Sequence, residues 1–540
     1  MSTSTDQPSA WSPLRHSLFR ALWIASVVSN LGTWMEEVGE AWLMTDQTAS
    51  PLLVSLLQTA DGLPIFLLAL PAGALADIVD RRRLLLFTQG WMCAAATGLG
   101  VLTLLGLTTP WVLLAFTCAL GAGTALNVPA WQAIMPEVVS REELPSAAAL
   151  GGIGFNIARS AGPAVGGLIV AAAGPGAVFL LNAASFVGVI VVLYRWRRAP
   201  RHGVLPTERV AGAVRAGLRY ARYAPALRAV LVRTLAFIVC GSALWGLLPV
   251  VGRRELELTS VGYGVMLGCL GLGAVGGATA LPALRRRLST DALVAAATVL
   301  WAGVMTAFAF VREFPLLCLV LGAGGMGWIA LMSSLNVAAQ TAVPSWVRGR
   351  ALALYVLSFQ GGMAVGGALW GYVAAHAGIA VALIVAAFGL LAGLLTIAVY
   401  RLPRAAAADL SPSLRWPDPV VSAEMETERG PVLVTVEYHI DPAKAEDFAR
   451  TGFGLRVIRR RDGAVNWGLF QDLADLSRWI ETFVVETWAE HLRQHERITV
   501  EDRHVEEAVR AFQVGGEPPV VKHHIAPDFR DGETAEFLVP

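Results

Sequence analysis

The sequence predicts an all-α polytopic membrane protein with twelve transmembrane helices in two six-helix halves, followed by a small α+β domain. Of the 540 residues, 55% are hydrophobic and only 15% are charged, whereas about a quarter of the residues in a soluble domain are charged. About twelve apolar runs reach the roughly 20 residues that a membrane-spanning helix needs. Charge also divides the chain, because residues 1–405 carry a net charge of +11 and residues 406–540 a net charge of −10.

The predicted spans follow one another with short connections. The first run is interrupted by polar residues and has no small-residue cleavage site, so we expect a retained helix and not a signal peptide. The expected spans cover residues 19–44, 51–76, 84–107, 110–135, 147–172, 175–195, 227–250, 260–283, 290–311, 315–340, 350–375 and 377–400. The expected divisions are an N-terminal half (1–195), a linker (196–226), a C-terminal half (227–404), a second linker (405–429) and a soluble domain (430–540).

Arginine residues concentrate on one side of this topology. They lie between spans two and three, six and seven, eight and nine, and ten and eleven, for example at Arg81 to Arg83 and Arg285 to Arg287. Positively charged connections stay in the cytoplasm. We therefore expect a multi-pass protein of the plasma (inner) membrane with both termini in the cytoplasm.

The central linker holds an amphipathic pattern. Val210, Val214, Leu218 and Ala221 recur at helical spacing, with arginines on the opposite face. Such a helix fits an anionic inner leaflet. An ordinary solvated linker is the alternative.

The two halves repeat each other at three places. Gly73 to Arg83 and Gly277 to Arg287 both separate a glycine from three arginines by eight positions. The runs Leu126-Asn127-Val128 and Leu335-Asn336-Val337 correspond, as do Gly162-Pro163-Ala-Val-Gly166-Gly167 and Gly362-Met363-Ala-Val-Gly366-Gly367. Duplicated halves with a pathway between them are the architecture of secondary transporters.

Four acidic residues lie inside predicted spans. Ionisable groups in a membrane are costly and therefore indicate function. Asp61 lies near the middle of span two, while Glu36 and Glu40 share one face of span one. We expect these three to bind a cation or to exchange protons with the substrate, although Glu36 and Glu40 could lie in a wet outer mouth. Glu37 faces elsewhere on span one and is expected to be solvated or paired in a loop.

Arg159 is the one arginine well inside a predicted span. It could pair with an acid of span one or two, or bind an anionic substrate. The alternative is a structural ion pair near the inner end of the span. Both interpretations remain open at this point.

Other chemistry has little support in the sequence. The five cysteines lie in apolar runs without metal-ligand spacing. No nucleotide-binding motif of the Walker type is present, which disfavours ATP-driven transport. We expect no catalytic residue, no metal, no cofactor and no nucleic-acid partner.

The C-terminal part predicts alternating strands and helices. Residues 432–440 alternate like a strand, a helix follows Asp441-Pro442, and further strands are expected at 464–470 and 520–525. Its histidine and tryptophan residues could line a ligand pocket, although folding and dimer contacts are the favoured role; they are His439, His491, His495, Trp467, Trp479 and Trp488.

The charged hairpin and the span-five run carry a family resemblance. Gly73-x-Leu75-x-Asp77-x-x-x-Arg81 resembles the loop signature of the major facilitator superfamily, and Gly162-Pro163-x-x-Gly166-Gly167 resembles its antiporter signature. The resemblance implies that Gly73, Asp77 and Arg81 form a gating loop. It also implies a hinge or close helix packing at Gly162, Pro163, Gly166 and Gly167.

Two further segments resemble a subfamily. The run from Ser29 to Met35 resembles the transmembrane secretion effectors, which are exporters, and the resemblance covers about residues 14–400. The runs 461–472 and 488–497 are similar to the dimeric, ferredoxin-like antibiotic-biosynthesis-monooxygenase domains. This likeness implies a ferredoxin-like tail domain and a homodimer through it.

The chain departs from the superfamily signatures at several positions. Ile78 and Asp80 replace an arginine and a glycine of the loop signature, and Leu281 replaces its aspartate in the second half. Ala149 and Ala158 stand where the antiporter signature has glycine. The span-four arginine of proton-coupled members is missing, so proton coupling through that residue is not supported.

The sequence thus predicts a non-enzymatic exporter of a small amphiphilic molecule, such as a siderophore or drug, with proton antiport as its energy source. An uptake or facilitative carrier is one alternative. A carrier-like anchor with an enzymatic or ligand-sensing tail is another.

Overall fold

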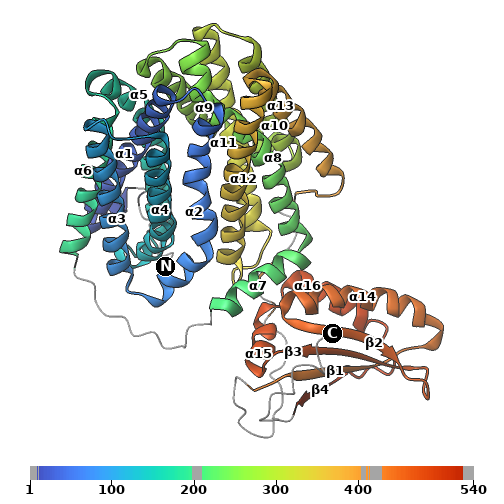
Figure 1. Cartoon of the computed structure of the whole chain (residues 1–540). Helices are drawn as coiled ribbons and strands as arrows, with labels where there is room; N and C mark the ends of the chain where they lie inside the picture. The colour runs from blue at the N-terminus through green and yellow to red at the C-terminus, as the bar shows by residue number, and fades with distance from the viewer. Residues whose placement is uncertain are drawn as a thin grey trace, which may run out of the picture. The chain divides into compact units, whose positions relative to one another are not determined.

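The computed structural model describes residues 9, 11–140, 142–196, 210–402, 409–411, 413 and 429–526. The first half contains six long helices, which Figure 1 shows in blue to green-cyan. They are α1 (Ser17–Gln47), α2 (Pro51–Ile78), α3 (Arg81–Leu104), α4 (Pro110–Val138), α5 (Leu144–Ala173) and α6 (Pro175–Arg195), with a short 3-10 turn, η1 (Ser12–Arg15), before them. The first six predicted spans are therefore confirmed as helices.

The second half repeats this set in the described residues. Its helices are α8 (Pro225–Val250), α9 (Ser260–Arg287), α10 (Thr290–Phe310), α11 (Phe314–Thr341), α12 (Arg348–Ala377) and α13 (Ile379–Gly393). A π-turn, η2 (Val251–Glu255), extends α8, and a 3-10 turn, η3 (Leu394–Ala398), extends α13. Eleven of the described helices are long and apolar enough to cross a membrane. The twelfth, α1, has 31 residues and carries three glutamates.

Local chemistry explains where these helices begin and end. Ser50 and Thr109 cap α2 and α4 with side-chain hydrogen bonds, and a proline follows each cap. Gly174 (φ +78°) ends α5 and Gly378 (φ +93°) ends α12. Both adopt the left-handed conformation that favours glycine. The same device at the fifth helix of each half adds a fourth correspondence to the internal repeat.

The basic triads lie in helices and not in the connections where we expected them. Asp80 accepts a hydrogen bond from the backbone N–H of Arg83 at 2.9 Å and so starts α3 at Arg81. In the second half, Arg285 to Arg287 form the last turn of α9, where positive charge is favourable for the helix dipole. An aspartate cap therefore explains the departure from the loop signature at position 80.

Within each half the helices pack as neighbours in a bundle. In the first half α2 packs on α4, α3 packs on α6, and α1 packs on both α5 and α6. In the second half α10 packs on α13. The two halves contact each other through α5 and α9, and also through α2 and α12. Figure 1 shows α2 beside α12.

The predicted helix of the central linker is present as α7 (Val210–Tyr223). Residues 211–230, 338–352 and 402–540 form one compact unit by their contacts, so α7 and the connection between α11 and α12 group with the C-terminal domain. The other residues of the chain form a second unit. Most of the second predicted linker, 405–429, lies outside the described residues.

The C-terminal domain has the order of elements β-α-β-β-α-β, with two consecutive helices at the second helical position. It contains β1 (Val432–His439), α14 (Ala445–Asp462), β2 (Ala464–Gln471), β3 (Arg478–Val485), α15 (Trp488–Arg497), α16 (Val500–Arg510) and β4 (Val520–Ile525), with a 3-10 turn, η4 (Pro442–Lys444), before α14. The sheet order is β2-β3-β1-β4 and every neighbouring pair is antiparallel. This is the ferredoxin-like arrangement. The predicted α+β fold of the tail is thus confirmed.

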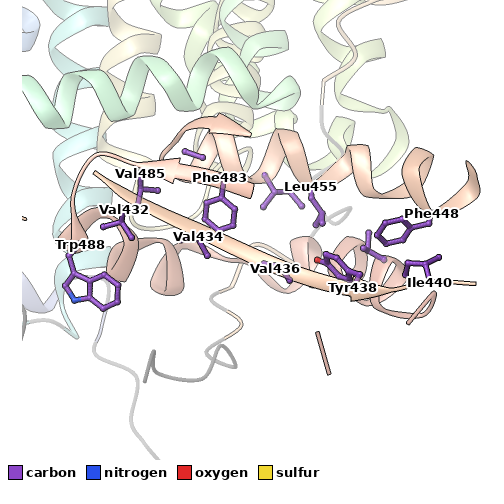
Figure 2. Packing of buried hydrophobic residues seen from close by; sticks show 13 residues of the cluster. Val432, Val434, Val436, Tyr438, Ile440, Phe448, Leu455, Phe483, Val485 and Trp488 are labelled. Carbon is purple, nitrogen blue, oxygen red and sulfur yellow. The ribbon is translucent and has the colours of Figure 1, made fainter. Parts of the chain in front are cut away.

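Alternation along β1 creates the core of this domain. Val432, Val434, Val436 and Tyr438 are buried on one face of the sheet, where they meet Phe448 of α14 (Figure 2). The ring centroids of Tyr438 and Phe448 are 5.4 Å apart. The sequence pattern with period two therefore specifies which face of the sheet the helices cover.

Candidate functional site

The two halves meet in a seam, which we define as the α2–α12 and α5–α9 contacts near the end of the bundle where α1 ends and α2 begins. In the α2–α12 part, the Thr59 hydroxyl donates to the carbonyl of Ala364 at 2.7 Å. A Cβ at Gly62 would lie 3.1 Å from the carbonyl oxygen of Gln360. The helices approach this closely because small residues face each other.

The α5–α9 part of the seam is built in the same way. A Cβ at Gly167 would lie 2.5 Å from the backbone oxygen of Ser260, and a Cβ at Gly264 would lie 2.6 Å from that of Pro163. The Ser260 hydroxyl donates to the Gly167 carbonyl at 3.0 Å. Further along, Gly271 meets Ser160. This part of the seam thus extends over about two turns of α5 and three turns of α9.

Charged residues close the seam at its end. Arg253 donates to Asp46 at 3.0 Å, and its guanidinium carbon lies 4.4 Å from the centroid of the Trp42 ring. Arg254 donates to the carbonyl of Thr48 at 2.8 Å. The two arginines follow α8 and their partners lie in or just after α1, so these contacts also join the halves.

Beyond the seam, open space faces several glycines. A Cβ added at Gly73 of α2, at Gly151 or Gly152 of α5, or at Gly276 of α9 would meet no atom within 4 Å. These positions lie toward the opposite end of the same four-helix contact. Gly73 lies on the same face of α2 as Gly62, and Gly152 on the same face of α5 as Pro163, so the close packing between the halves does not extend to these two positions.

Glu36 and Glu40 are buried inside the first half. Asn182 of α6 donates to Glu36, and Thr117 of α4 donates to Glu40 at 2.9 Å. One carboxylate oxygen of Glu36 is buried without a hydrogen bond among the described residues. Both side chains thus point into the packed core between α1, α4 and α6. They do not lie in a water-filled outer opening, which was the alternative location for them.

Glu37 and Asp61 are exposed, although they lie far along their helices. Glu37 lies ten residues before the end of α1 and Asp61 ten residues after the start of α2, which places both about 15 Å along the helix from the seam end. Their carboxylates lie close enough for their charges to interact, and Glu37 also interacts with Tyr263 of α9. The sequence placed Glu37 away from the site; the structure instead brings it together with Asp61.

The backbone of Asp61 is held firmly while its side chain is exposed. A Cβ at Gly121 of α4 would lie 2.5 Å from the carbonyl oxygen of Asp61. The glycine lets α4 approach this turn of α2. The backbone of Asp61 is therefore packed against α4, while its carboxylate is exposed.

Arg159 lies in the middle of α5, 15 residues after its first residue. Its Nε and Nη2 atoms are buried, and neither has a hydrogen-bond partner among the described residues. Among the described residues, Arg159 therefore pairs neither with an acid of α1 or α2 nor with a residue near the inner end of the span.

The glycines of the span-five run have packing partners on two sides. A Cβ at Gly162 would lie 2.5 Å from the Cβ of Trp34, and a Cβ at Gly166 would lie 2.9 Å from the Cα of Met35. Pro163 and Gly167 face α9 in the seam. This run joins α1 to α5 and both halves to each other, which accounts for a packing role; the hinge role stays a prediction.

Gly73 and Arg81 of the predicted gating loop lie in different environments. Gly73 faces open space, and the side chain of Asp77 lies outside the described residues. Arg81 donates to Glu137 of α4 at 2.9 Å and to the Ala133 carbonyl at 3.1 Å. Arg81 thus anchors α3 to α4 within the first half, and the gating role of the three residues stays a prediction.

The fold and the seam can be compared with known proteins. The sequence profile of the family described as transmembrane secretion effectors matches residues 8–531. The chain belongs to this family. The family consists of major facilitator superfamily transporters, and its match extends over the C-terminal domain as well as the helices.

Characterised relatives are similar to the chain over much of their length. The multidrug efflux pump Tap of Mycolicibacterium fortuitum is 27% identical over 60% of this chain and 81% of its own length. The enterobactin exporter of Salmonella typhimurium is 26% identical over 66% of this chain and 85% of its own. The staphyloferrin A transporter of Staphylococcus aureus is 25% identical over 47% of this chain and 64% of its own.

Solved structures confirm the major facilitator fold. A POT family transporter in complex with 5-aminolevulinic acid superimposes with a TM-score of 0.59, covering 71% of this chain and 95% of its own at 12% identity. The nucleoside transporter NupG superimposes with a TM-score of 0.55, covering 72% of this chain and 100% of its own, also at 12% identity. At this identity the likeness concerns the fold alone.

In this transmembrane secretion effector, α8 contains a buried ion pair that the sequence did not predict. The helix begins at Pro225, so Arg233 lies two turns inside it and pairs with Asp291 of α10. Pro225, two residues after the end of α7, is the local signal for the start of α8, because proline is favoured at the first position of a helix.

An aromatic cluster packs the second half. Trp328 of α11 lies at its centre, with ring centroids 4.9 Å from Trp301 and 5.3 Å from Trp245. Phe237 and Phe359 complete it. Because its members lie on α8, α10, α11 and α12, no local sequence pattern could have revealed it.

The candidate residues of the tail do not form one pocket. His439 is exposed on β1, Trp467 donates to buried Glu481 at 3.0 Å, and Trp488 belongs to the hydrophobic core. His491 is fully buried, and its ring nitrogen lies 3.3 Å from that of His495. In the part of the chain that the structure describes, no three His, Cys, Asp or Glu residues are grouped to hold a metal.

Burial changes the acid–base chemistry of His491. Desolvation, followed by the positive charge of the neighbouring His495 and His523, lowers the pKa of His491 to about 3. Gln494 of α15 and Arg459 of α14 also face this ring. The imidazole is therefore neutral at physiological pH, and it acts as a polar core residue of the tail.

Proposed function

We propose that this protein exports a small amphiphilic molecule across the plasma membrane by alternating access, driven by proton antiport. Both termini are cytoplasmic in this proposal, and the seam lies on the outer side. The positive-inside rule supports this orientation, because the connections opposite the seam carry most of the arginines.

The single observation that carries the proposal is the distribution of contacts between the halves. They pack closely at the seam, whereas Gly73 of α2 and Gly152 of α5, which lie on the same helix faces as Gly62 and Pro163, face open space beyond it. A transporter that is closed outside and open inside would have this distribution. Rocking of one half against the other would then separate the seam and expose the middle of the bundle outside.

Glu37 and Asp61 are the residues we assign to proton exchange. Each lies ten residues from the seam end of its helix, both are exposed, and they repel each other. Two interacting carboxylates can release a proton on one side of the membrane and bind one on the other as the substrate leaves. Glu36 and Glu40 belong to the same charge cluster, and their buried hydrogen bonds make them positioning residues for α1.

The family relationship supports the direction of transport. Relatives named as an efflux pump and as an enterobactin exporter align with 60% and 66% of this chain. An uptake or facilitative carrier is the competing proposal, and the two differ in how substrate movement responds to a pH gradient.

Everted membrane vesicles with an imposed pH gradient test the proposal. Acid inside the vesicles should drive accumulation of the substrate, and a protonophore should abolish it. A panel of metabolites compared between a deletion strain and its parent identifies that substrate. Accumulation that is insensitive to the protonophore would overturn proton antiport.

Neutralising Asp61 tests the assigned acids. Asp61→Asn and Glu37→Gln should each reduce gradient-driven transport by about 100-fold or more, because a removed proton site uncouples the cycle. Glu142→Gln, which changes an exposed acid in the connection before α5, serves as the matched control and should transport normally. Full gradient-driven transport by both Asp61→Asn and Glu37→Gln would remove these residues from the mechanism.

A further inference from the structure

Arg159 has an unusual combination of position and unmet hydrogen bonding. It lies in the middle of a 30-residue membrane helix, and two of its guanidinium nitrogens are buried without a partner among the described residues. A buried, unsatisfied donor costs roughly 1–3 kcal/mol, and more when it is charged. A ligand that accepts those hydrogen bonds would offset this cost.

The described acids of α1 and α2 do not supply such a ligand. Asp61 and the three glutamates of α1 interact with one another and with Tyr263, and none of these interactions includes Arg159. The positive charge is therefore separate from the acidic cluster.

Arg159 also lies where the two halves begin to part. Its neighbour Ser160 makes the last close contact of the α5–α9 seam, where a Cβ added at Gly271 would lie 2.9 Å from the Cα atom of Ser160. Toward the other end of α5, Gly151 and Gly152 face open space. The hydroxyl of Ser160 is a second buried polar group without a partner among the described residues.

We propose that Arg159 is a substrate-binding residue that captures an anionic group, a carboxylate or a group of similar charge and shape, on the exported molecule. The inference rests on the proposed function and specifies its substrate class as anionic amphiphiles. A guanidinium presents a planar fork that matches two carboxylate oxygens. Substrate and protons would then occupy separate sites, with Arg159 on α5 and the acids on α1 and α2.

A matched pair of probes tests the assignment on the full-length protein in phosphatidylcholine nanodiscs. Pyrenebutyrate carries the carboxylate, and pyrenebutyramide has the same shape without the charge. Binding is measured by energy transfer from the tryptophans to pyrene, with empty nanodiscs as the background. The wild type should bind the acid roughly 10- to 100-fold more tightly than the amide.

The variants separate charge from fold. Arg159→Gln should bind acid and amide equally, whereas Arg159→Lys, which keeps the charge but loses the fork, should retain a part of the preference. If Arg159→Gln does not fold, the test is whether Arg159→Lys prefers pyrenebutyrate over pyrenebutyramide less strongly than the wild type does. Arg195→Gln changes an exposed arginine in the last turn of α6 and should bind like the wild type.

Three results would overturn the inference. One is no measurable preference of the wild type for the acid, and another is a preference that Arg159→Gln and Arg159→Lys leave unchanged. The third is loss of acid binding when phosphatidylglycerol is added, because a lipid headgroup would then be the occupant of the site. The proposed function fails separately, since protonophore-insensitive transport would leave the probe preference intact.

Discussion

At the scale of single residues, the membrane-embedded carboxylates of the first half occupy two environments. Glu36 and Glu40 are buried and accept hydrogen bonds from α6 and α4, whereas Glu37 and Asp61 are exposed. Residues one position apart on α1 thus belong to different parts of the structure. The helical rotation of 100° per residue explains the division, because it turns adjacent side chains toward different neighbours.

His491 gives a pH dependence to the stability of the tail domain. Its pKa is about 3 in the folded domain and near 6.5 when unfolded, so between these values the unfolded state binds more protons. Stability should therefore fall as the pH falls below about 6.5, by up to roughly 2 kcal/mol between pH 7 and pH 5. Hydrogen exchange of β1 and β4 in the full-length protein, corrected for intrinsic rates, measures this loss.

A variant pair separates His491 from the other histidines. His491→Gln should reduce the difference between pH 7 and pH 5, because glutamine does not titrate. His439→Gln, at an exposed position of β1, should keep the whole difference. An undiminished pH dependence in His491→Gln would show that other groups cause it.

At the scale of elements, α7 is a structural part of the compact unit that contains the C-terminal domain. Tyr220 of α7 is 2% exposed and packs edge-on against Trp346, with ring centroids 5.6 Å apart. The guanidinium carbon of Arg497 lies 4.5 Å from the centroid of the Trp346 ring. Glu490 of α15 accepts from both Arg219, at 2.8 Å, and Arg497, at 2.6 Å.

Removing Trp346 should release α7 from this unit. Trp346→Ala eliminates an aromatic contact and a cation–π contact and leaves a cavity, which together should cost about 3 kcal/mol. We expect hydrogen exchange in α7 to increase by roughly 100-fold. Arg215→Ala provides the control, because the Arg215–Glu486 pair is at least half exposed and contributes about 0–1 kcal/mol. Unchanged protection of α7 in Trp346→Ala would contradict the packing role.

The sequence predicted the elements better than their partners. Hydrophobic length located all twelve long helices, and amphipathic spacing located α7, because these signals are local. The partner of α7 was not visible, since Tyr220 meets a tryptophan 126 positions later in the chain. The environment of Glu36 likewise depends on Asn182, and that of Arg81 on Glu137. Tertiary packing determines which distant positions meet. A local stretch of one sequence contains no pattern that shows these pairs.

At the scale of the whole molecule, alternating access requires the seam to open. Cysteines at Ala164 of α5 and Gly268 of α9 would hold it closed, because a Cβ at Gly268 lies 3.9 Å from the Cβ of Ala164. This distance is close to the mean for a disulfide. Oxidation of the Ala164→Cys/Gly268→Cys protein should abolish transport, and reduction should restore it, as measured in the everted vesicles.

The design of this experiment includes its own controls. Each single-cysteine variant should transport equally under oxidising and reducing conditions, since the five native cysteines are unpaired in the structure. Undiminished transport by the fully crosslinked protein would show that the α5–α9 part of the seam does not separate during the cycle.

The glycines of the seam have a consequence for how the protein could be tuned. At Gly62, Gly167 and Gly264, contact between the halves depends on the absence of a single methyl group. Each methyl added there would act as a wedge that disfavours the closed form, and 1.4 kcal/mol of such strain shifts the ratio of two conformations tenfold. Alanine at successive seam positions would therefore form a graded series, in which resting occupancy of the two states changes stepwise while every chemical group that handles protons or substrate stays the same.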